Sequence, residues 1–327
     1  MAMWIQRDFA HSPDKRDTAI TIGSFDGVHR GHQALIRRMV THAQETGLKP
    51  IVITFDPLPG QVLMPDEYKL LSTLEERAEL IESLGVVGLI ALPFDETVRN
   101  MSAEVFIRQL ATHLGIKALW IGPDFRLGRN REGDAELLHG AGHRYGFDLH
   151  IHNEVITWQG KPVHSSRIRA ALREGRIDEA NGCLGYPYRL SGIVEEGNRR
   201  GRILGFPTAN VAVPRERLLP RYGVYLCQAR LGDQALDAIV NVGRRPTFDN
   251  GSPTVEAHLL DFNGDLYQRT LRLEFLAWLR PERKFASVVA LTKQLQRDRI
   301  EARRRFQMLR ERGKAPSLSY EDSRINA

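Results

Sequence analysis

Cysteine is scarce in this chain. Only Cys183 and Cys227 occur among its 327 residues, and neither belongs to a Cys-x-x-Cys pair or has Cys/His zinc spacing. The sequence therefore predicts neither a disulfide framework nor a structural zinc site. We expect both thiols to be buried as small apolar side chains.

Long hydrophobic runs are also lacking. No stretch approaches the roughly 20 apolar residues of a membrane-spanning helix. The first residues, Met-Ala-Met-Trp-Ile-Gln-Arg-Asp, have neither the apolar core nor the cleavage pattern of a signal peptide. Internal repeats and low-complexity segments are missing as well. We therefore expect a cytoplasmic protein with no membrane partner.

The charge balance is modestly basic. Lys and Arg number 46 against 40 Asp and Glu, a net charge of +6, which suits nucleic acid or small polyanionic substrates. Much of the excess lies between Lys293 and Lys314, where Asp298, Glu301 and Glu311 are interleaved. Because that stretch lacks an aromatic stacking platform, we favour a solvated helix face over an RNA-binding module. Steeply salt-dependent RNA binding would support the alternative.

The most informative stretch runs from Ile20 to Gln33. It reads as an apolar strand, a glycine-rich turn and a helix start with two histidines three residues apart. Free N–H groups at a helix start favour phosphate oxygens, glycines let an anion approach the backbone, and residues three apart share a helix face. The pattern predicts a nucleotide triphosphate site, although a tight turn with two solvated histidines has the same spacing. The candidate contacts are Gly23, Phe25, His29, Gly31 and His32.

Strand and helix patterns alternate up to Gly185. We expect strands at 18–23, 50–55, 86–92, 117–122 and 148–153, and helices at 33–46, 72–84, 102–114 and 133–145. Successive units of this kind predict a doubly wound parallel sheet, with ligands beyond the carboxyl ends of its strands. Residues 1–185 are assigned to this α/β domain.

After Tyr186 the pattern changes to short β segments. We expect strands at 188–196, 223–231, 235–242, 254–262 and 271–279, then one amphipathic helix at 287–312. Strands without intervening helices predict an antiparallel barrel or sandwich, of which we adopt the barrel. Asn263-Gly264 favours a tight hairpin turn between the last two strands. Residues 186–327 are assigned to this domain.

Polar groups follow other strands of the first domain. Asp124 lies in a loop between two glycines, and Ser165 and Ser166 open a helix with Arg169 one turn on. Singly, each is equally a polar loop or an ordinary serine N-cap. Together they predict adenylyl transfer, because attack on the α-phosphorus of ATP needs alignment and charge stabilisation rather than a protein nucleophile.

Glycines surround basic residues between Gly192 and Asn210. This suggests a phosphate loop, but not the usual P-loop, since no Gly-Lys-Ser/Thr ends it. Thr208 and Asn210 offer oxygens to Mg²⁺ and a nucleotide. The candidate nucleotide contacts are Gly201, Arg202, Gly205, Pro207, Thr208 and Asn210.

Glu256 is the candidate general base. In an extended strand it shares a face with His258, Leu260 and Phe262. A carboxylate on such a largely apolar face is costly unless it is paired or functional. A glutamate at an open barrel mouth is the alternative interpretation.

Seven segments together resemble the prokaryotic bifunctional riboflavin kinase/FAD synthetase family. The resemblance spans Thr18 to Arg304 and implies that the barrel phosphorylates riboflavin with ATP and Mg²⁺ to give FMN. It also implies that the first domain transfers AMP from ATP to FMN, giving FAD and pyrophosphate, with no nucleic-acid partner. The segments are Gly23–His32, Gly122–Gly128, Ser165–Arg169, Leu204–Asn210, Gly223–Tyr225, Asn241–Phe248 and Glu256–Phe262.

The resemblance also implies roles for single residues. In the first domain His29, His32 and Arg169 would contact ATP phosphates with help from Ser165 and Ser166. The residue near the nucleotide would be Asp124.

In the barrel, Thr208 and Asn210 would hold Mg²⁺ and the nucleotide. Glu256 would take the proton from the 5′-hydroxyl of riboflavin.

Three positions depart from the family pattern. Leu58 replaces a histidine between two prolines, His164 stands where the serine run usually begins, and Gln268 replaces a glycine. The first two lie in the adenylyltransferase half. The alternative is therefore a riboflavin kinase whose adenylyltransferase half is weakened or altered. The sequence does not predict the oligomeric state.

Overall fold

A computed structural model describes residues 2–196, 205–244 and 253–311. The chain divides into two compact units, Met1–Ser165 and Ser166–Ala327, each described here by itself. Helix α7 (Ser165–Glu174), apart from its first residue, and helix α8 (Ile177–Leu184) group with the second unit. The domain boundary at 185/186 stays a prediction.

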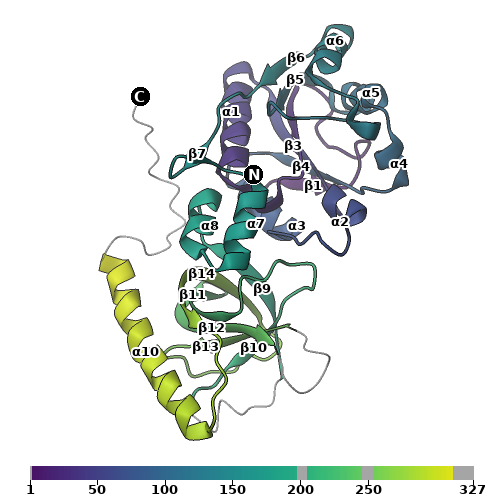
Figure 1. The fold of residues 1–327 in the computed structure, drawn as a ribbon. Coiled ribbons are helices and arrows are strands. Elements are labelled where there is room, and N and C mark those ends of the chain that lie inside the picture. The colour runs from purple at the N-terminus through teal and green to yellow at the C-terminus, as the bar shows by residue number, and fades with distance from the viewer. Residues whose placement is uncertain (1, 197–204, 245–252, 312–327) are drawn as a thin grey trace. The chain divides into compact units, whose positions relative to one another are not determined.

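The first unit is built on a parallel six-stranded sheet with strand order β1-β4-β3-β2-β5-β6 (Figure 1). Its strands are β1 (Trp4–Gln6), β2 (Thr18–Ile22), β3 (Lys49–Phe55), β4 (Gly88–Leu92), β5 (Ile116–Ile121) and β6 (Asp148–Ile151). Its α-helices are α1 (Arg30–Thr46), α2 (Pro59–Leu63), α3 (Leu74–Glu82), α4 (Glu96–Asn100), α5 (Ala103–Leu114) and α6 (Ala135–Tyr145). Two 3-10 turns, η1 (Asp26–Val28) and η2 (Arg129–Arg131), and a small hairpin of β7 (Thr157–Trp158) and β8 (Lys161–Pro162) complete it.

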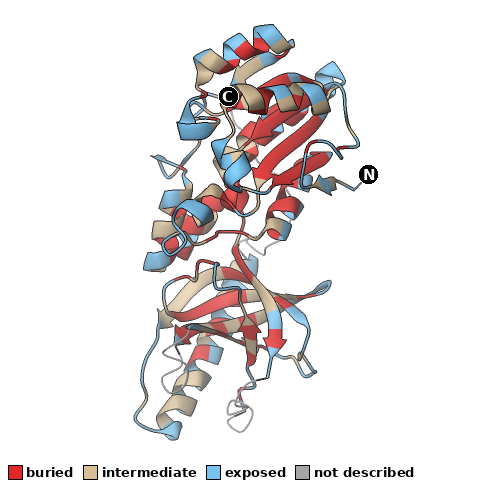
Figure 2. Ribbon diagram, turned by 90° about the vertical axis from the view of Figure 1, so that its right-hand side faces the viewer, coloured by how far each residue is buried: buried red, intermediate tan, exposed pale blue. Residues whose placement is uncertain are grey.

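The apolar runs of the sequence form the centre of this sheet. Every residue of β2 and β4 is buried (Figure 2), which is the pattern of parallel strands covered on both faces. One apolar cluster joins Ile20 and Ile53 of the sheet to Phe106 and Leu110 of α5. Local signals set the helix ends: Thr73 begins α3 with a capping box, and left-handed glycines end α1, α5 and α6.

The second unit contains a closed antiparallel barrel in the strand order β10-β13-β12-β11-β14-β9. Its strands are β9 (Tyr188–Glu195), β10 (Ala209–Ala212), β11 (Gly223–Leu231), β12 (Gln234–Arg244), β13 (Pro253–Leu259) and β14 (Thr270–Pro281). In β13, Val255, Ala257 and Leu259 are buried, whereas Glu256 and His258 alternate with them and are half-buried. The buried set therefore faces the barrel interior and the other set faces outward.

A long helix, α10 (Val288–Glu311), covers part of the outer barrel surface. Ala302 and Phe306 of this helix join Leu226 and Leu260 of the barrel in a small apolar cluster. Cys183 and Cys227 are both buried, as predicted, and neither forms a disulfide bond.

The predicted fold class is confirmed, since a parallel α/β sheet is followed by an antiparallel barrel and a terminal helix. The prediction of a hairpin at Asn263-Gly264 is wrong, because the strands on its two sides do not pair with each other. Strand β13 pairs with β10 and β12, whereas β14 pairs with β9 and β11. Within the described ranges no helix combines the length and apolar character needed to cross a bilayer.

Candidate functional sites

The glycine-rich turn between β2 and α1 has an unusual backbone. Phe25, with φ of 46°, and Val28, with φ of 34°, are in the left-handed region, as is Gly27. Such angles are uncommon for residues with a side chain. A Cβ on Gly23 would lie 3.0 Å from the Phe25 ring, so this glycine makes room for the ring. The turn is therefore shaped by close packing of its own side chains.

His29 and His32 form a stacked pair at the start of α1. Their ring centroids are 3.6 Å apart at 16° between planes, and the His29 Nδ1 accepts a hydrogen bond from the His32 backbone N–H. A Cβ on Gly31 would lie 3.3 Å from the His29 ring, so the missing side chain leaves space for the stack. The structure thus brings Gly23, Phe25, His29, Gly31 and His32 into one compact turn, as predicted from their spacing.

Burial controls the charge of His32. The pKa of His32 is well below its ordinary value, because burial disfavours the charged ring and repulsion from His29 adds to this. Among the described residues, the buried His32 Nδ1 has no hydrogen-bond partner. An imidazole stack with such an atom is suited to receive a proton or a hydrogen bond when an anion binds.

The other predicted residues of the adenylyltransferase half lie on loops and a helix start. Asp124 is exposed in the turn after β5, which neighbours β2 in the parallel sheet, so it emerges at the same strand edge as the histidine turn. Ser165 is the first residue of α7. Ser166 and Arg169 follow in that helix and belong to the second unit.

The two departures from the family pattern lie in different environments. Leu58 is fully buried as the N-cap residue of α2, where its N–H donates to Gln61 Oε1 at 2.9 Å. It is followed by three exposed apolar residues, Val62, Leu63 and Met64. His164 is exposed. Leu58 therefore packs in the interior, and the apolar surface beside it is formed by the three residues Val62, Leu63 and Met64.

Two charged residues near this turn escaped the sequence analysis. Asp26 and Arg77 are both almost completely buried. Asp26, which is part of the turn, binds the backbone of Ser72, and Arg77 binds the backbone of Ser24 just before the turn. Asp26 lies inside the recognised motif, so its position was available as a signal. The sequence held no signal for Arg77, because its helix is far along the chain from the turn.

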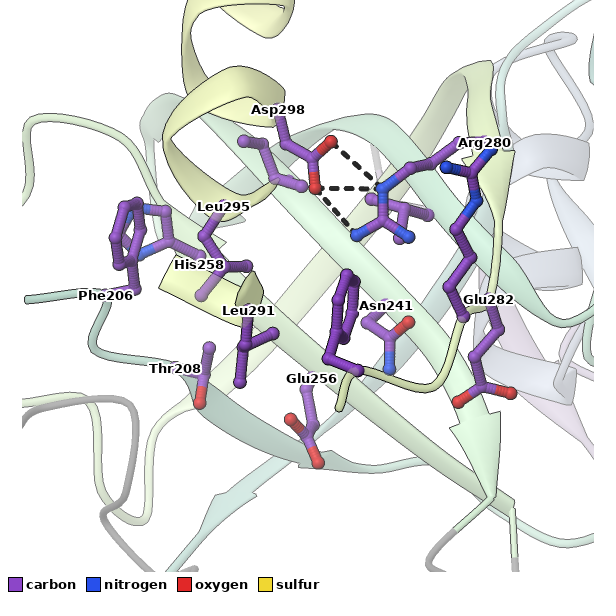
Figure 3. Close-up of a pocket in the computed structure, with 14 residues that line it drawn as sticks. Phe206, Thr208, Asn241, Glu256, His258, Arg280, Glu282, Leu291, Leu295 and Asp298 are labelled. Carbon is purple, nitrogen blue, oxygen red and sulfur yellow. Dashed lines mark hydrogen bonds and ion pairs between the residues drawn. The ribbon is translucent and has the colours of Figure 1, made fainter. Parts of the chain in front are cut away.

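The barrel carries a cavity of about 320 Å³ between its outer surface and α10 (Figure 3). The side chains of Thr208, Asn241, Glu256 and His258 line it from the barrel. Apolar groups from α10, from the segment just before it and from the end of the phosphate loop form the opposite wall. These are Phe206, Phe285, Leu291 and Leu295.

Glu256 is central among the polar groups of this cavity. Its register partners are Asn210 on β10 and Asn241 on β12. His258 shares its face, as predicted, but β13 ends at Leu259, so Leu260 is beyond the strand, and Phe262 lines a different cavity. The face is thus more polar than predicted, which lowers the cost of placing a carboxylate there.

A buried ion pair fixes α10 beside the cavity. The Arg280 guanidinium donates to both carboxylate oxygens of Asp298, at 2.7 to 3.0 Å (Figure 3). The side chain of Gln294 also donates to Asp298. Arg280 comes from the end of β14 and Asp298 from the middle of α10. The pair therefore fastens the helix that forms one wall of the cavity.

A second cavity, of about 690 Å³, is lined by the inward-facing side chains of β10 and β13 and by the loop after β13. Thr208 lines both cavities and is exposed. Pro207 lines the larger cavity, and its carbonyl oxygen lies 2.8 Å from Nδ1 of His258. Gly205 has a φ of 76° just before this segment. Gly201 and Arg202 lie outside the described residues.

The first unit is a parallel α/β unit with an imidazole turn at a helix start, and the barrel that follows carries a carboxylate beside a polar loop. Together these features define a two-part nucleotide-dependent transferase. Models of two protein families match the chain: FAD synthetase over residues 11–167 and riboflavin kinase over residues 184–306. The chain is 38% identical to the bifunctional riboflavin kinase/FMN adenylyltransferase of Pseudomonas fluorescens, over 89% of this chain and 94% of that protein. It is 35% identical to the protein of the same name from Bacillus subtilis, over 91% and 95%.

The chain therefore belongs to the bifunctional riboflavin kinase/FMN adenylyltransferase family. Its fold is also similar to a solved structure described as a macrolide-efflux protein from Streptococcus pneumoniae, with a TM-score of 0.84 and 29% identity, covering 93% of this chain and 99% of that one. The resemblance predicted from the sequence motifs is thus confirmed, with the two parts in the predicted order.

Proposed function

We propose that the barrel phosphorylates riboflavin at the small cavity and that the first unit adenylylates the resulting FMN at the histidine turn. The observation that carries the kinase half is the position of Thr208, which borders both barrel cavities with Glu256 in the smaller one. A flavin in the apolar cavity under α10 and ATP in the larger cavity would meet at this residue.

Glu256 is the proposed general base of the kinase step. Its carboxylate accepts the proton of the ribityl 5′-hydroxyl as the hydroxyl oxygen attacks the γ-phosphorus of ATP, and ADP leaves. Its register partners Asn210 and Asn241 place amide groups on both sides. The side chains of Phe206, Leu291 and Leu295 exclude water from the flavin side of the cavity.

The donor set fits Mg²⁺ better than a transition metal. The described part of the chain holds no group of three or more His, Cys, Asp and Glu side chains placed to bind a metal. Thr208 and Asn210 instead provide neutral oxygens, and Mg²⁺ commonly binds through one or two protein oxygens together with substrate phosphates and water. When bound, the ion supplies charge neutralisation on the transferring phosphates.

In the first unit the proposed reaction joins FMN and AMP. A phosphate oxygen of FMN attacks the α-phosphorus of ATP, the bond to the β-phosphate oxygen breaks, and pyrophosphate leaves with its charge. His29 and His32 hold phosphate oxygens, and a proton taken up by the stack offsets the growing negative charge. Gly23, Phe25 and Gly31 shape the turn. Asp124 and Ser165 are the further nucleotide contacts that we propose in this unit. The roles of Ser166 and Arg169 as nucleotide contacts stay predictions.

The competing possibility is a kinase with a weakened adenylyltransferase half. It is favoured by one specific observation, the buried Leu58 where the family usually has a histidine. Purified protein incubated with riboflavin, ATP and Mg²⁺ separates the two by product analysis. Accumulating FAD supports both proposed activities, whereas FMN without FAD supports the alternative. If neither FMN nor FAD forms, both are wrong.

A further inference from the structure

The left-handed conformation of Phe25 is held from both sides. This residue, with φ of 46°, is 2% exposed, and its ring meets His32 edge-on at 5.2 Å between centroids. A left-handed residue with a large side chain is strained and persists only where its surroundings impose that conformation. Those surroundings are two buried charged side chains.

Arg77 of α3 fixes the chain before Phe25. Its Nη1 donates to the carbonyl oxygen of Ser24 at 3.0 Å and to Thr54 Oγ1 at 3.1 Å, and both Nη atoms donate to the carbonyl oxygen of Phe55 at 3.2 Å. Thr54 itself donates to the same Ser24 carbonyl at 3.1 Å. One guanidinium therefore joins the ends of β2 and β3, directly before the turn.

Asp26 fixes the chain after Phe25. Its carboxylate oxygens accept hydrogen bonds from the backbone N–H of Leu71, at 3.0 and 3.1 Å, and from the backbone N–H of Ser72, at 3.0 Å. They also accept from the hydroxyls of Ser72 and Tyr68. The Ser72 hydroxyl oxygen in turn accepts from the Gly27 N–H at 2.8 Å. The turn is thus fastened to the segment that leads into α3.

The two charges also compensate each other electrically. Burial lowers the pKa of Arg77, and the carboxylates of Asp26 and Asp56 oppose that shift. A buried cation surrounded by carbonyl oxygens and by neighbouring carboxylates keeps its charge and its geometry. Arg77 and Asp26 are therefore rigid supports of the turn.

We propose that Arg77 and Asp26 are positioning residues for adenylyl transfer: they hold Phe25 left-handed from its two sides, and the Phe25 ring in turn holds the His32 imidazole in its stack with His29. This inference rests on the proposed role of the histidine turn. Neither charged group needs to touch a substrate.

Three variants test the supports. Arg77→Met removes the guanidinium, whereas Arg77→Lys keeps the positive charge but loses the two-pronged hydrogen bonding of the guanidinium. Thr54→Val removes one hydroxyl at nearly constant side-chain volume. We expect Arg77→Met to lower kcat/KM for FMN adenylylation about 10²-fold, as small displacements of reacting groups do. Arg77→Lys should recover part of this loss, and Thr54→Val should lose less than Arg77→Met. Riboflavin kinase activity, measured on the same preparations, should stay within twofold of the wild type.

Arg108→Met is the matched control. Arg108 is exposed on α5, so the same substitution there should leave both activities unchanged. Asp26→Asn tests the other support, because an amide has one acceptor oxygen where the carboxylate has two. It should reduce adenylylation while preserving the kinase.

A second measurement needs no catalysis. The His32 imidazole signal, identified by its loss in His32→Gln, should titrate well below pH 6.5 in the wild type. In Arg77→Met and Asp26→Asn it should move upward as the ring is released. A wild-type protein that forms no FAD would overturn the proposed function, and this titration would still test the supports. Unchanged His32 titration in both variants, or equal loss of both activities in every variant, would overturn the inference.

Discussion

Asn210 lies directly opposite Glu256 across the antiparallel pair β10–β13. On the other side of Glu256, Asn241 of β12 occupies the same row, and Val224 of β11 continues it into the cavity. Side chains opposite each other on neighbouring strands are about 5 Å apart at Cβ. The barrel therefore places a carboxylate between two amides on a rigid sheet, where its orientation does not depend on a loop.

Substituting Glu256 by glutamine tests its role as a base. Glutamine keeps the shape and the neighbours but cannot accept the hydroxyl proton, so riboflavin phosphorylation should fall by roughly 10² or more. Adenylylation of supplied FMN should not change. The two activities are measured as initial rates of FMN formation from riboflavin and of FAD formation from FMN. Equal loss of both activities would show that the substitution damages the fold.

Removing the Thr208 hydroxyl tests the metal contact. Thr208→Ala should raise the Mg²⁺ concentration needed for half-maximal kinase activity by about tenfold, since one oxygen ligand is worth on the order of 1 kcal/mol. The Mg²⁺ dependence of FAD formation from supplied FMN is the control. Thr292→Ala, an equivalent change in α10, should leave both titrations as in the wild type. An unaltered Mg²⁺ titration in Thr208→Ala would remove Thr208 from the metal site.

The depressed pKa of His32 predicts a pH-dependent stability. The ring is neutral when folded, but it takes up a proton in the unfolded chain below its ordinary value of 6.5. The unfolded state then binds more protons, so the free energy of unfolding falls as pH drops below 6.5 and continues to fall until the folded pKa is reached. Urea unfolding between pH 8 and pH 5 should show a flatter profile for His32→Gln than for the wild type. Parallel profiles would contradict a buried neutral imidazole.

The Arg280–Asp298 pair predicts a linkage between helix docking and flavin binding. Asp298→Ala leaves a guanidinium without its buried partner, which costs about 3 kcal/mol of stability in comparable pairs. The KM for riboflavin should rise, because α10 forms a wall of the cavity. The double variant Arg280→Met/Asp298→Leu should recover most of the stability, since it removes both charges together. If the double variant did not regain stability, the ion pair would have a role beyond attaching α10 to the barrel.

Net charge predicts little about partners here. Four of the seven basic residues of α10 are engaged in ion pairs. Arg304 and Arg305 pair with Glu301, Arg303 pairs with Asp261, and Arg310 pairs with Asp237. We therefore expect no tight, steeply salt-dependent RNA binding, which a fluorescence titration at two salt concentrations would check. Tight binding that weakens strongly with salt would revive the RNA-binding alternative.

Much of the fold was predictable because its signals are local. The fully buried β2 is a continuous apolar run, and glycines or capping boxes mark the ends of several helices. The Asn263-Gly264 signal failed because strand pairing in a barrel is decided by distant partners: β14 pairs with β9, whose sequence lies far upstream. The short strands β1 and β10 were missed for the same reason, as each depends on a partner rather than on its own pattern.

The sites divide in a similar way. The closeness of His29 and His32 followed from their spacing. The stacking of their rings and the register of Asn210 with Glu256 did not. Arg77 was beyond sequence reasoning, because nothing in its helix indicates a buried cation at the turn. The cytoplasmic location and the domain boundary at 185/186 stay predictions.

Both cysteines of the chain are buried thiols outside any disulfide, and both lie in the second unit, Cys183 on α8 and Cys227 on β11. Burial also raises the pKa of the Cys227 thiol well above its ordinary value, so the reactive thiolate is scarce while this unit is folded. Every thiol-labelling event therefore reports an opening of the barrel unit and none reports the other unit. Pulsed alkylation of the two thiols would therefore measure how often the kinase half unfolds, and it would do so in the intact two-part enzyme.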